Sequence, residues 1–248
     1  MSVGNSVQDR DFEALHLQDE HLPLMLATTW NLIEIRRYVD AIKQTDRILA
    51  IDPENFLGNY YRAIAYLRNR SFVDAEIFAK KALVINPNNA GALHILGCSL
   101  KSQRKFQEAE PALRTAISLR PTETNFYTTL TALLNSTSRY DESIEIGVTG
   151  LIHDPNHANL HNNLALAFLF LQNPLMAEEH ALKALELNSQ DAKHHQVMGM
   201  VSISKRNFRK AIFSFANAIR LNPTGDLLLD YVNRWRKIIV LLDKILSR

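Results

Sequence analysis

Five of the eight prolines of this 248-residue chain recur at a fixed interval. Successive members are 34 residues apart, or twice that distance apart in one case, at Pro53, Pro87, Pro121, Pro155 and Pro223. The missing member would be Ser189, whose surroundings, Leu-Asn-Ser-Gln-Asp, resemble the Ile-Asn-Pro-Asn-Asn around Pro87. Self-similarity at intervals of about 20 to 50 residues is typical of solenoids and propellers. The spacing therefore predicts six repeated units between about Leu22 and Gly225.

Small residues recur in register with the prolines. Three columns hold Ala, Gly, Ser or Thr in almost every unit: Thr29, Ala63, Gly97, Thr131, Ala165 and Gly199; Ala41, Ala75, Ala109, Ser143, Ala177 and Ala211; Ile48, Ala82, Ala116, Gly150, Ala184 and Ala218. Small side chains at matched positions allow two helices to approach closely. The columns therefore predict that each unit is a hairpin of two helices and that the chain has essentially no strand.

The chain resembles the tetratricopeptide repeat family, whose pattern places a small residue after Leu, then Ala, a large apolar residue and a closing Pro every 34 residues. The third unit shows this pattern best, at Leu96-Gly97, Leu100, Ala109, Leu113, Ala116 and Pro121. The resemblance implies an all-α, right-handed superhelical solenoid of six such hairpins with a C-terminal capping helix. The usual Trp at the fourth position is replaced by Met25, Asn59, Leu93, Tyr127, His161 and His195.

We expect three parts along the chain. An N-terminal segment, 1–21, is expected to be partly ordered or helical. The six units are expected at 22–55, 56–89, 90–123, 124–157, 158–191 and 192–225. Residues 226–248 have Leu229, Val232 and Trp235 at helical spacing and are expected to cap the apolar face that a terminal repeat leaves uncovered.

Local signals predict helix starts and one weak unit. Asn173-Pro174 is typical of an N-cap followed by Pro at the first helical position, and Ser71 with Asp74 resembles a capping box. The fourth unit has Gly147 and Gly150 where larger residues are expected. Glycine weakens a helix, so these two indicate either a compliant hinge or a tolerated close contact between helices.

Net charge and cysteine content indicate which classes of partner and which cellular compartment to expect. The net charge is +2, too small to draw the whole molecule onto nucleic acid, so no nucleic-acid partner is expected. The single cysteine, Cys98, excludes an internal disulfide and favours a reducing compartment, so the cytoplasm is expected. Unbroken apolar runs, such as 238–242, are far below the roughly 20 residues that span a bilayer. We expect no integral membrane segment and no export signal in residues 1–18.

The sequence favours a non-catalytic protein without cofactors. It has no phosphate-binding glycine loop, no Cys-x-x-Cys and no nucleophile elbow. His153, His157 and His161 are four residues apart, but Pro155 interrupts them and no thiol or carboxylate completes a ligand set. We therefore expect no metal site.

The resemblance implies that the first helix of each unit lines a concave groove that binds a peptide or helix of a partner protein. Family groove positions supply an apolar and aromatic group of candidates, namely Trp30, Tyr60, Tyr61, Ile64 and His94. They also supply amides and hydroxyls suited to a ligand backbone, namely Asn125, Thr128, Asn159, Asn162 and Asn163. The alternative is that the aromatic residues pack between hairpins and the asparagines are solvated. A family clamp for a chaperone C-terminus is missing, because Leu26, Trp30, Tyr61, Gly91 and Ile95 replace its polar residues.

These observations predict an adaptor, scaffold or chaperone that binds a polypeptide in its groove. A second function class stays open. The chain would then be a self-assembling scaffold, or a peripheral membrane component of a larger complex, acting through its outer surface or its C-terminal helix. Trp235, Arg234 and Lys237 would suit a membrane interface in that case.

Overall fold

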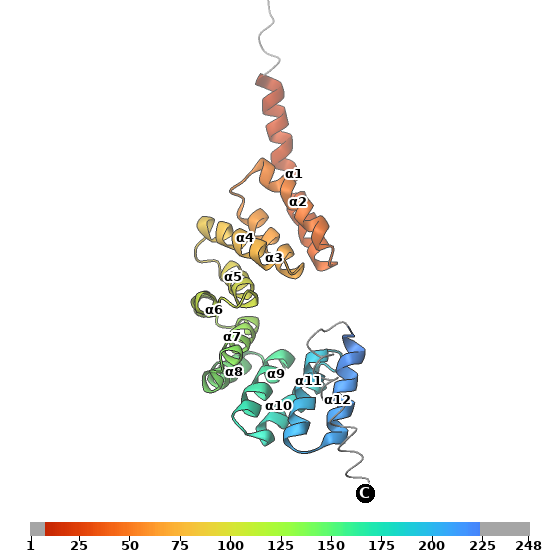
Figure 1. The fold of residues 1–248 in the computed structure, drawn as a ribbon. Helices are drawn as coiled ribbons and strands as arrows, with labels where there is room; N and C mark the ends of the chain where they lie inside the picture. The colour runs from red at the N-terminus through yellow and green to blue at the C-terminus, as the bar shows by residue number, and fades with distance from the viewer. Residues whose placement is uncertain (1–7, 224–248) are drawn as a thin grey trace, which may run out of the picture. The chain divides into compact units, whose positions relative to one another are not determined.

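The structure is a computed structural model that describes the backbone of residues 8–223 and the side chains of residues 21–223. This part of the chain is an all-α repeat solenoid of twelve helices without a strand, as predicted (Figure 1). The first helices of the hairpins are α1 (Gln8–Glu34), α3 (Phe56–Arg68), α5 (Ala90–Ser102), α7 (Thr124–Ser136), α9 (Ala158–Phe170) and α11 (Ala192–Ser204). The second helices are α2 (Tyr38–Ile51), α4 (Phe72–Ile85), α6 (Phe106–Leu119), α8 (Tyr140–His153), α10 (Pro174–Leu187) and α12 (Phe208–Leu221).

Helix positions follow the proline interval. From α2 onward, corresponding helices of successive hairpins begin 34 residues apart. The exception is α1, which has 27 residues where α3 has 13, because it begins within the predicted N-terminal segment. The predicted capping helix, 226–248, lies outside the described residues.

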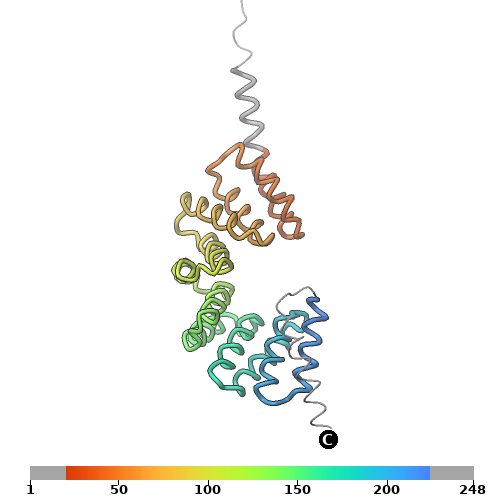
Figure 2. The backbone as a smooth tube through the Cα atoms, viewed as in Figure 1, coloured from red at the N-terminus to blue at the C-terminus, as the bar shows by residue number. Residues whose placement is uncertain are grey.

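The chain divides into two compact units, residues 1–121 and residues 122–248, and each has three of the described hairpins. In the first unit α3 contacts both α1 and α5, and in the second α9 contacts both α7 and α11. Among the described helices, the second helices of neighbouring hairpins make no such contact. Each unit is therefore curved, with its first helices on the inner side and its second helices on the outer side. Figure 2 traces the hairpins of each unit as a backbone tube. We call the surface formed by the first helices the inner face.

The columns of small residues form the seams of both units. Every member of the three columns is buried, and the second and third columns are fully buried wherever they hold Ala. Ile48, the single large member, is also fully buried. Close helix packing thus explains why these positions stay small, as predicted.

The two glycines of α8 are sites of close approach. A Cβ atom on Gly150 would lie 2.7 Å from Leu160 Cδ2 and 2.8 Å from Tyr127 Cβ. A Cβ atom on Gly147 would lie 2.6 Å from Leu164 Cδ2. Distances this short do not occur between non-bonded carbons, so a Cβ atom at Gly150 would displace Tyr127 and one at Gly147 would displace the end of the Leu164 side chain. Both glycines of the fourth unit are therefore sites of close contact between helices.

Each hairpin turns through one residue in the left-handed region of the backbone. These residues have φ between 57° and 65° and none is glycine: Arg36, Arg70, Arg104, Ser138, Gln172 and Arg206. At the second turn, the amide of Arg70 donates to Leu67 O and that of Ser71 donates to Tyr66 O, the bond pattern of a Schellman motif. A side chain in this conformation costs roughly 1 kcal/mol or more relative to glycine.

Helix caps depend on side-chain length at these turns. Asn173 accepts a hydrogen bond from the amide of Met176, and Pro174 begins α10, as predicted. Ser71 precedes α4 but makes no side-chain cap, so the predicted capping box is wrong. The backbone at both residues has ψ between 74° and 79°. The longer Asn side chain reaches the amide three residues ahead from this conformation, whereas the shorter Ser side chain does not.

In the second, fifth and sixth units Asn or His takes the place of the repeated Trp at the fourth position. Asn59 Nδ2 lies 3.1 Å from Pro53 O, and His161 Nε2 lies 2.9 Å from Pro155 O. His195 Nε2 makes the corresponding contact with the carbonyl at position 189, at 2.9 Å. The carbonyl six residues earlier is thus bound in three units, which ties the loop between hairpins to the next helix.

A buried carboxylate joins two hairpins of the first unit. Glu76 on α4 is 7% exposed and accepts hydrogen bonds from Lys80 (2.5 Å), Gln103 (2.8 Å) and Lys105 (2.8 Å). Burial alone would raise the pKa of Glu76, but the bonds from Lys105, Lys80 and Gln103 outweigh it and lower the pKa to about 2. The second unit repeats the arrangement, with Glu178 accepting from Lys205 and Lys210.

An arginine replaces an apolar residue in the seam between α2, α3 and α4. Arg62 precedes Ala63, where later units have Leu or Met. Its guanidinium lies 4.4 Å from the centre of the Phe78 ring, and Nη2 bonds Asp46 Oδ1 at 2.5 Å. The planar cation therefore stacks where an aliphatic side chain would otherwise pack.

Candidate functional site

Four aromatic rings form a continuous row on the inner face of the first unit. Ring centres lie 5.7 Å apart for Phe56 and Tyr60, 6.0 Å apart for Tyr60 and Tyr61, and 5.5 Å apart for Tyr61 and Trp30. All four side chains are partly or substantially exposed, and Trp30 is 42% exposed. We call these residues the aromatic row. Three of the aromatic candidates are thus brought together, and Phe56 is a member that sequence reasoning did not include.

The aromatic row stands on an apolar base. Tyr60 and Tyr61 pack against a cluster that includes Ile33, Ala41 and Ile64, and Ile64 is 7% exposed. Ile64 therefore belongs to the buried apolar layer on which the aromatic row packs. A Cβ atom at Gly91 would lie 2.5 Å from the Tyr60 hydroxyl, so glycine at this position leaves room for that ring.

His94 on α5 lies at the edge of this region. Its Nε2 is 3.4 Å from Cys98 Sγ. Burial, followed by the charges of Lys101 and Arg68, lowers the pKa of His94 to about 4. His94 is therefore neutral at neutral pH.

The pKa of His94 predicts a loss of stability in mild acid. Unfolding restores the ordinary pKa of 6.5, so the unfolded chain binds a proton more readily than the folded chain. The stabilisation by neutral His94 is complete above pH 6.5 and is lost as pH falls toward 4. By linkage, lowering pH from 7.5 to 5.5 costs about 1.4 kcal/mol through this group. Urea unfolding of the protein and of His94→Gln at both pH values measures it: the variant should lose less stability, and an equal loss would exclude His94 as the cause.

Hydrogen bonds of Asn163 join α9 to α7 in the second unit. Asn163 Nδ2 on α9 donates to Thr128 O and Thr131 Oγ1 on α7, both at 2.9 Å. In return Asn135 Nδ2 donates to Asn163 O at 2.9 Å. These three bonds tie α7 to α9, so both amide donors of Asn163 are engaged within the protein. What Asn163 still offers a ligand is its Oδ1 acceptor.

Histidines engage two further polar candidates. His157 lies 3.3 Å from Asn125 Oδ1 through Nε2 and 3.4 Å from Thr128 Oγ1 through Nδ1. Asn159 Oδ1 lies 3.1 Å from Nε2 of His194, which is fully buried. The exposed amides of Asn125 and Asn159 thus belong to contacts between neighbouring hairpins.

Asn162 differs from the other polar candidates. It is 8% exposed, and its Oδ1 atom has no hydrogen-bond partner within the described residues. A buried acceptor without a partner costs free energy, about 1 kcal/mol or more. Asn162 is therefore the polar candidate with an unmet hydrogen-bonding need.

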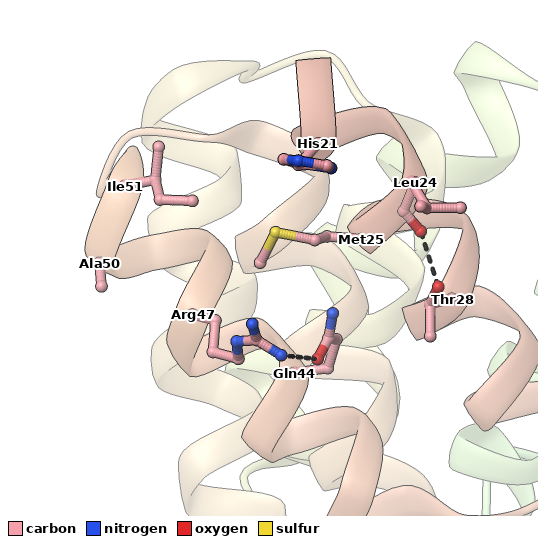
Figure 3. Close-up of a pocket in the computed structure, with 8 residues that line it drawn as sticks. All are labelled: His21, Leu24, Met25, Thr28, Gln44, Arg47, Ala50 and Ile51. Atoms are coloured by element: carbon pink, nitrogen blue, oxygen red, sulfur yellow. Dashed lines mark hydrogen bonds between the residues drawn. The ribbon is translucent and has the colours of Figure 1, made fainter. Parts of the chain in front are cut away.

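A separate cavity of about 650 Å³ lies between α1 and α2. Figure 3 shows its lining: His21, Leu24, Met25, Thr28, Gln44, Arg47, Ala50 and Ile51. Arg47 Nη1 is 3.5 Å from Gln44 Oε1, and Thr28 Oγ1 donates to Leu24 O at 2.7 Å. The lining has no paired acid and base and no nucleophile, so its chemistry is that of a packing surface.

The described residues include neither a candidate metal-binding cluster nor a candidate membrane-spanning helix. No three His, Cys, Asp or Glu side chains among residues 21–223 are placed to hold a metal ion together. His161 Nδ1 and His180 Nδ1 lie 2.9 Å apart as a pair on α9 and α10. None of the helices between residues 8 and 223 combines the length and the hydropathy that crossing a bilayer requires.

Two family models described as tetratricopeptide repeat match the sequence of this chain, one at residues 30–90 and the other at residues 90–123 and 158–191. The chain belongs to the tetratricopeptide repeat family. The resemblance inferred from the proline interval and the small-residue columns is thereby confirmed. No curated protein matches the chain in sequence.

Solved structures with the same fold are distant in sequence. PilW, a widely conserved type IV pilus biogenesis factor, is 16% identical with a TM-score of 0.73, and the match covers 85% of this chain and 98% of PilW. PilF of Pseudomonas aeruginosa is 17% identical with a TM-score of 0.70, covering 87% and 98%. YrrB, a tetratricopeptide repeat protein with an unusual peptide-binding site, is 20% identical with a TM-score of 0.57, covering 74% and 94%. At these identities the likeness shows the fold alone.

Proposed function

We propose that this chain is a non-catalytic protein-interaction module, an adaptor or scaffold of the cytoplasm, whose inner faces bind a partner polypeptide. The aromatic row carries the proposal. Four partly exposed rings on a packed apolar base offer a large, rigid surface. Covering this surface with a ligand is favourable because it buries aromatic area. Family membership supports the same function class, and YrrB shows that the fold can carry a peptide-binding site.

The two units would contribute different chemistry. In the first unit Trp30, Tyr60 and Tyr61 would contact apolar side chains of the ligand, with Ile64 and His94 supporting them. In the second unit the Asn162 Oδ1 acceptor, which is buried without a partner, would turn outward to receive an N–H group of the ligand. Asn125, Thr128, Asn159 and Asn163 would mainly hold that surface in shape through their bonds to neighbouring hairpins.

Selection from a random peptide library, followed by calorimetry on the selected peptides, tests the proposal. We expect Trp30→Ala to weaken a selected peptide by about 2 kcal/mol, the loss typical of an aromatic residue at the centre of an interface. Asn162→Ala should weaken a peptide that binds the second unit by about 1 kcal/mol. Tyr140→Ala is the matched control, because Tyr140 stacks on Phe170 at 5.0 Å and lies outside the aromatic row. Selected peptides that bind Trp30→Ala and the parent equally well would contradict the role of the row.

Exposed apolar residues on the second helices favour one alternative, a self-assembling scaffold. Val84 is 82% exposed, Ile152 74%, Leu175 71% and Phe213 69%. Such side chains on an outer surface suit contacts between copies. Sedimentation at increasing protein concentration separates the two functions, since assembly through this surface would raise the mass and Leu175→Glu would lower it again.

A further inference from the structure

Three arginines line one edge of the first unit. Arg36, Arg70 and Arg104 occupy the left-handed position of its three hairpin turns, with φ of 62°, 65° and 63°. All three are exposed, and none makes a side-chain hydrogen bond or ion pair with another described residue. We call these residues the arginine row.

The arginine row lies in the turns that follow the first helices of this unit. Because α1, α3 and α5 lie side by side, the turns that follow them lie along one edge of the inner face. Arg68 lies in the last turn of α3, and Lys101 lies in the last turn of α5. The positive charges of both side chains contribute to the lowered pKa of His94. The two rows therefore belong to the same set of first helices, with the rings on α1 and α3 and the arginines in the turns after α1, α3 and α5.

The hairpin turn does not itself require arginine. In the second unit Ser138 and Gln172 adopt the same conformation at the same position, with φ of 61° and 58°. A cation near a helix C-terminus is favourable, by a few tenths of a kcal/mol. That benefit would apply equally to both units, yet the three successive arginines occur in the first unit alone among the described turns.

Charge is concentrated in the same unit. Residues 21–121 carry 14 Lys and Arg against 9 Asp and Glu, whereas residues 122–223 carry 8 against 9. The net charge of the whole chain, +2, conceals this local excess. The first unit as a whole thus carries the positive charge that an acidic ligand would complement, in addition to the aromatic row that apolar groups would cover.

We propose that the partner segment bound by the first unit is an acidic polypeptide, with Asp or Glu side chains on the arginine row and large apolar side chains on the aromatic row. This inference rests on the proposed function and specifies the ligand of the same face. A polypeptide fits better than a nucleic acid because Asp40, Asp74 and Glu108 lie in the first turns of α2, α4 and α6, just beyond the arginines. A continuous phosphate backbone would meet these carboxylates, whereas a polypeptide can place its acidic side chains between them.

Fluorescence anisotropy with three labelled polymers tests the inference: a random copolymer of glutamate and tyrosine, polyglutamate, and oligo(dT). The key variant is Arg36→Gln/Arg70→Gln/Arg104→Gln, because Gln172 shows that glutamine fits this backbone position. Arg206→Gln is the matched control in the second unit, and circular dichroism checks that both variants stay folded. We expect the copolymer to bind more tightly than polyglutamate, and the triple variant to lose about tenfold in affinity. Arg206→Gln should bind like the parent, and added salt should weaken binding to the parent more than to the triple variant.

The outcomes separate this inference from the function on which it rests. Equal binding of the copolymer to the parent and to the triple variant would overturn the inference. If Trp30→Ala weakens the copolymer in that case, the interaction function stands without the acidic ligand. Tighter binding of oligo(dT) than of the copolymer, with the same loss in the triple variant, would assign the surface to nucleic acid and overturn the inference. If the triple variant instead lowers the mass of self-associated protein and leaves copolymer affinity unchanged, the occupant is a second copy and the inference is wrong.

Discussion

Replacing Glu76 with Ala is expected to destabilise the protein by about 3 kcal/mol at neutral pH, because the pKa of this carboxyl falls from 4.5 to about 2 on folding. The folded state binds the proton less readily than the unfolded state. The stabilisation is therefore complete above pH 4.5 and is lost as pH falls toward 2. Urea unfolding at pH 7 and pH 3 measures the effect, and the difference between parent and variant at pH 3 should be less than half of that at pH 7.

Glu178 provides the matched comparison. Its carboxyl side chain is 24% exposed, against 10% for Glu76, and it also bonds two lysines. Glu178→Ala should cost less, because solvent screens a more exposed ion pair more strongly. Equal costs at the two sites, or a Glu76→Ala cost that does not depend on pH, would show that the carboxylate is not the source of the stability.

Replacing Gly150 with Ala is expected to destabilise the second unit by about 2 kcal/mol, although Ala is the better helix former by about 1 kcal/mol. The added methyl group would overlap Tyr127 Cβ and Leu160 Cδ2. Tyr127 is 3% exposed and Leu160 is fully buried, so neither has room to move away. The helices α7 and α9 would have to shift from α8.

Thr149→Ala is the control for this substitution, since Thr149 is the exposed neighbour of Gly150 on the same helix. Thermal unfolding should give a lower midpoint for Gly150→Ala and an almost unchanged one for Thr149→Ala. A raised midpoint for Gly150→Ala would mean that helix propensity outweighs the steric overlap and that α8 is free to adjust.

The repeat and its hairpins could be predicted from the sequence because they depend on residue size and spacing. A column such as Ala41 to Ala211 recurs in register, and each member is fully buried. Close packing tolerates few alternatives at such a position, so the signal survives in a single sequence. The helix count and the family followed from that signal.

Features that depend on one partner far away in the sequence could not be predicted. Asn163 reads as a surface amide, yet its bonds reach residues 28 to 35 positions earlier. Arg62 reads as a break in the Leu and Met column, and only the structure shows it between Asp46 and Phe78. The left-handed turns were hidden for a different reason, because arginine, serine and glutamine give no local signal for positive φ.

The candidate site was predictable in part. Family positions identified Trp30, Tyr60 and Tyr61, and the structure brings their rings into one row. Phe56 was missed because it stands at the first residue of α3, before the positions that the family pattern marks. The arginine row was missed because its residues lie in the turns after the first helices, which are also outside the positions that the family pattern marks.

The contacts between helices also determine how such a chain can fold. Within each unit, every helix contacts only helices that are at most two places away in the chain. A nucleus therefore needs to close only short loops, which favours fast folding, and any hairpin pair can serve as the starting point. Unfolding can likewise begin at one hairpin without the others, so backbone amides near the outermost described hairpins should exchange with deuterium sooner than those of α3 and α9, which have neighbours on both sides.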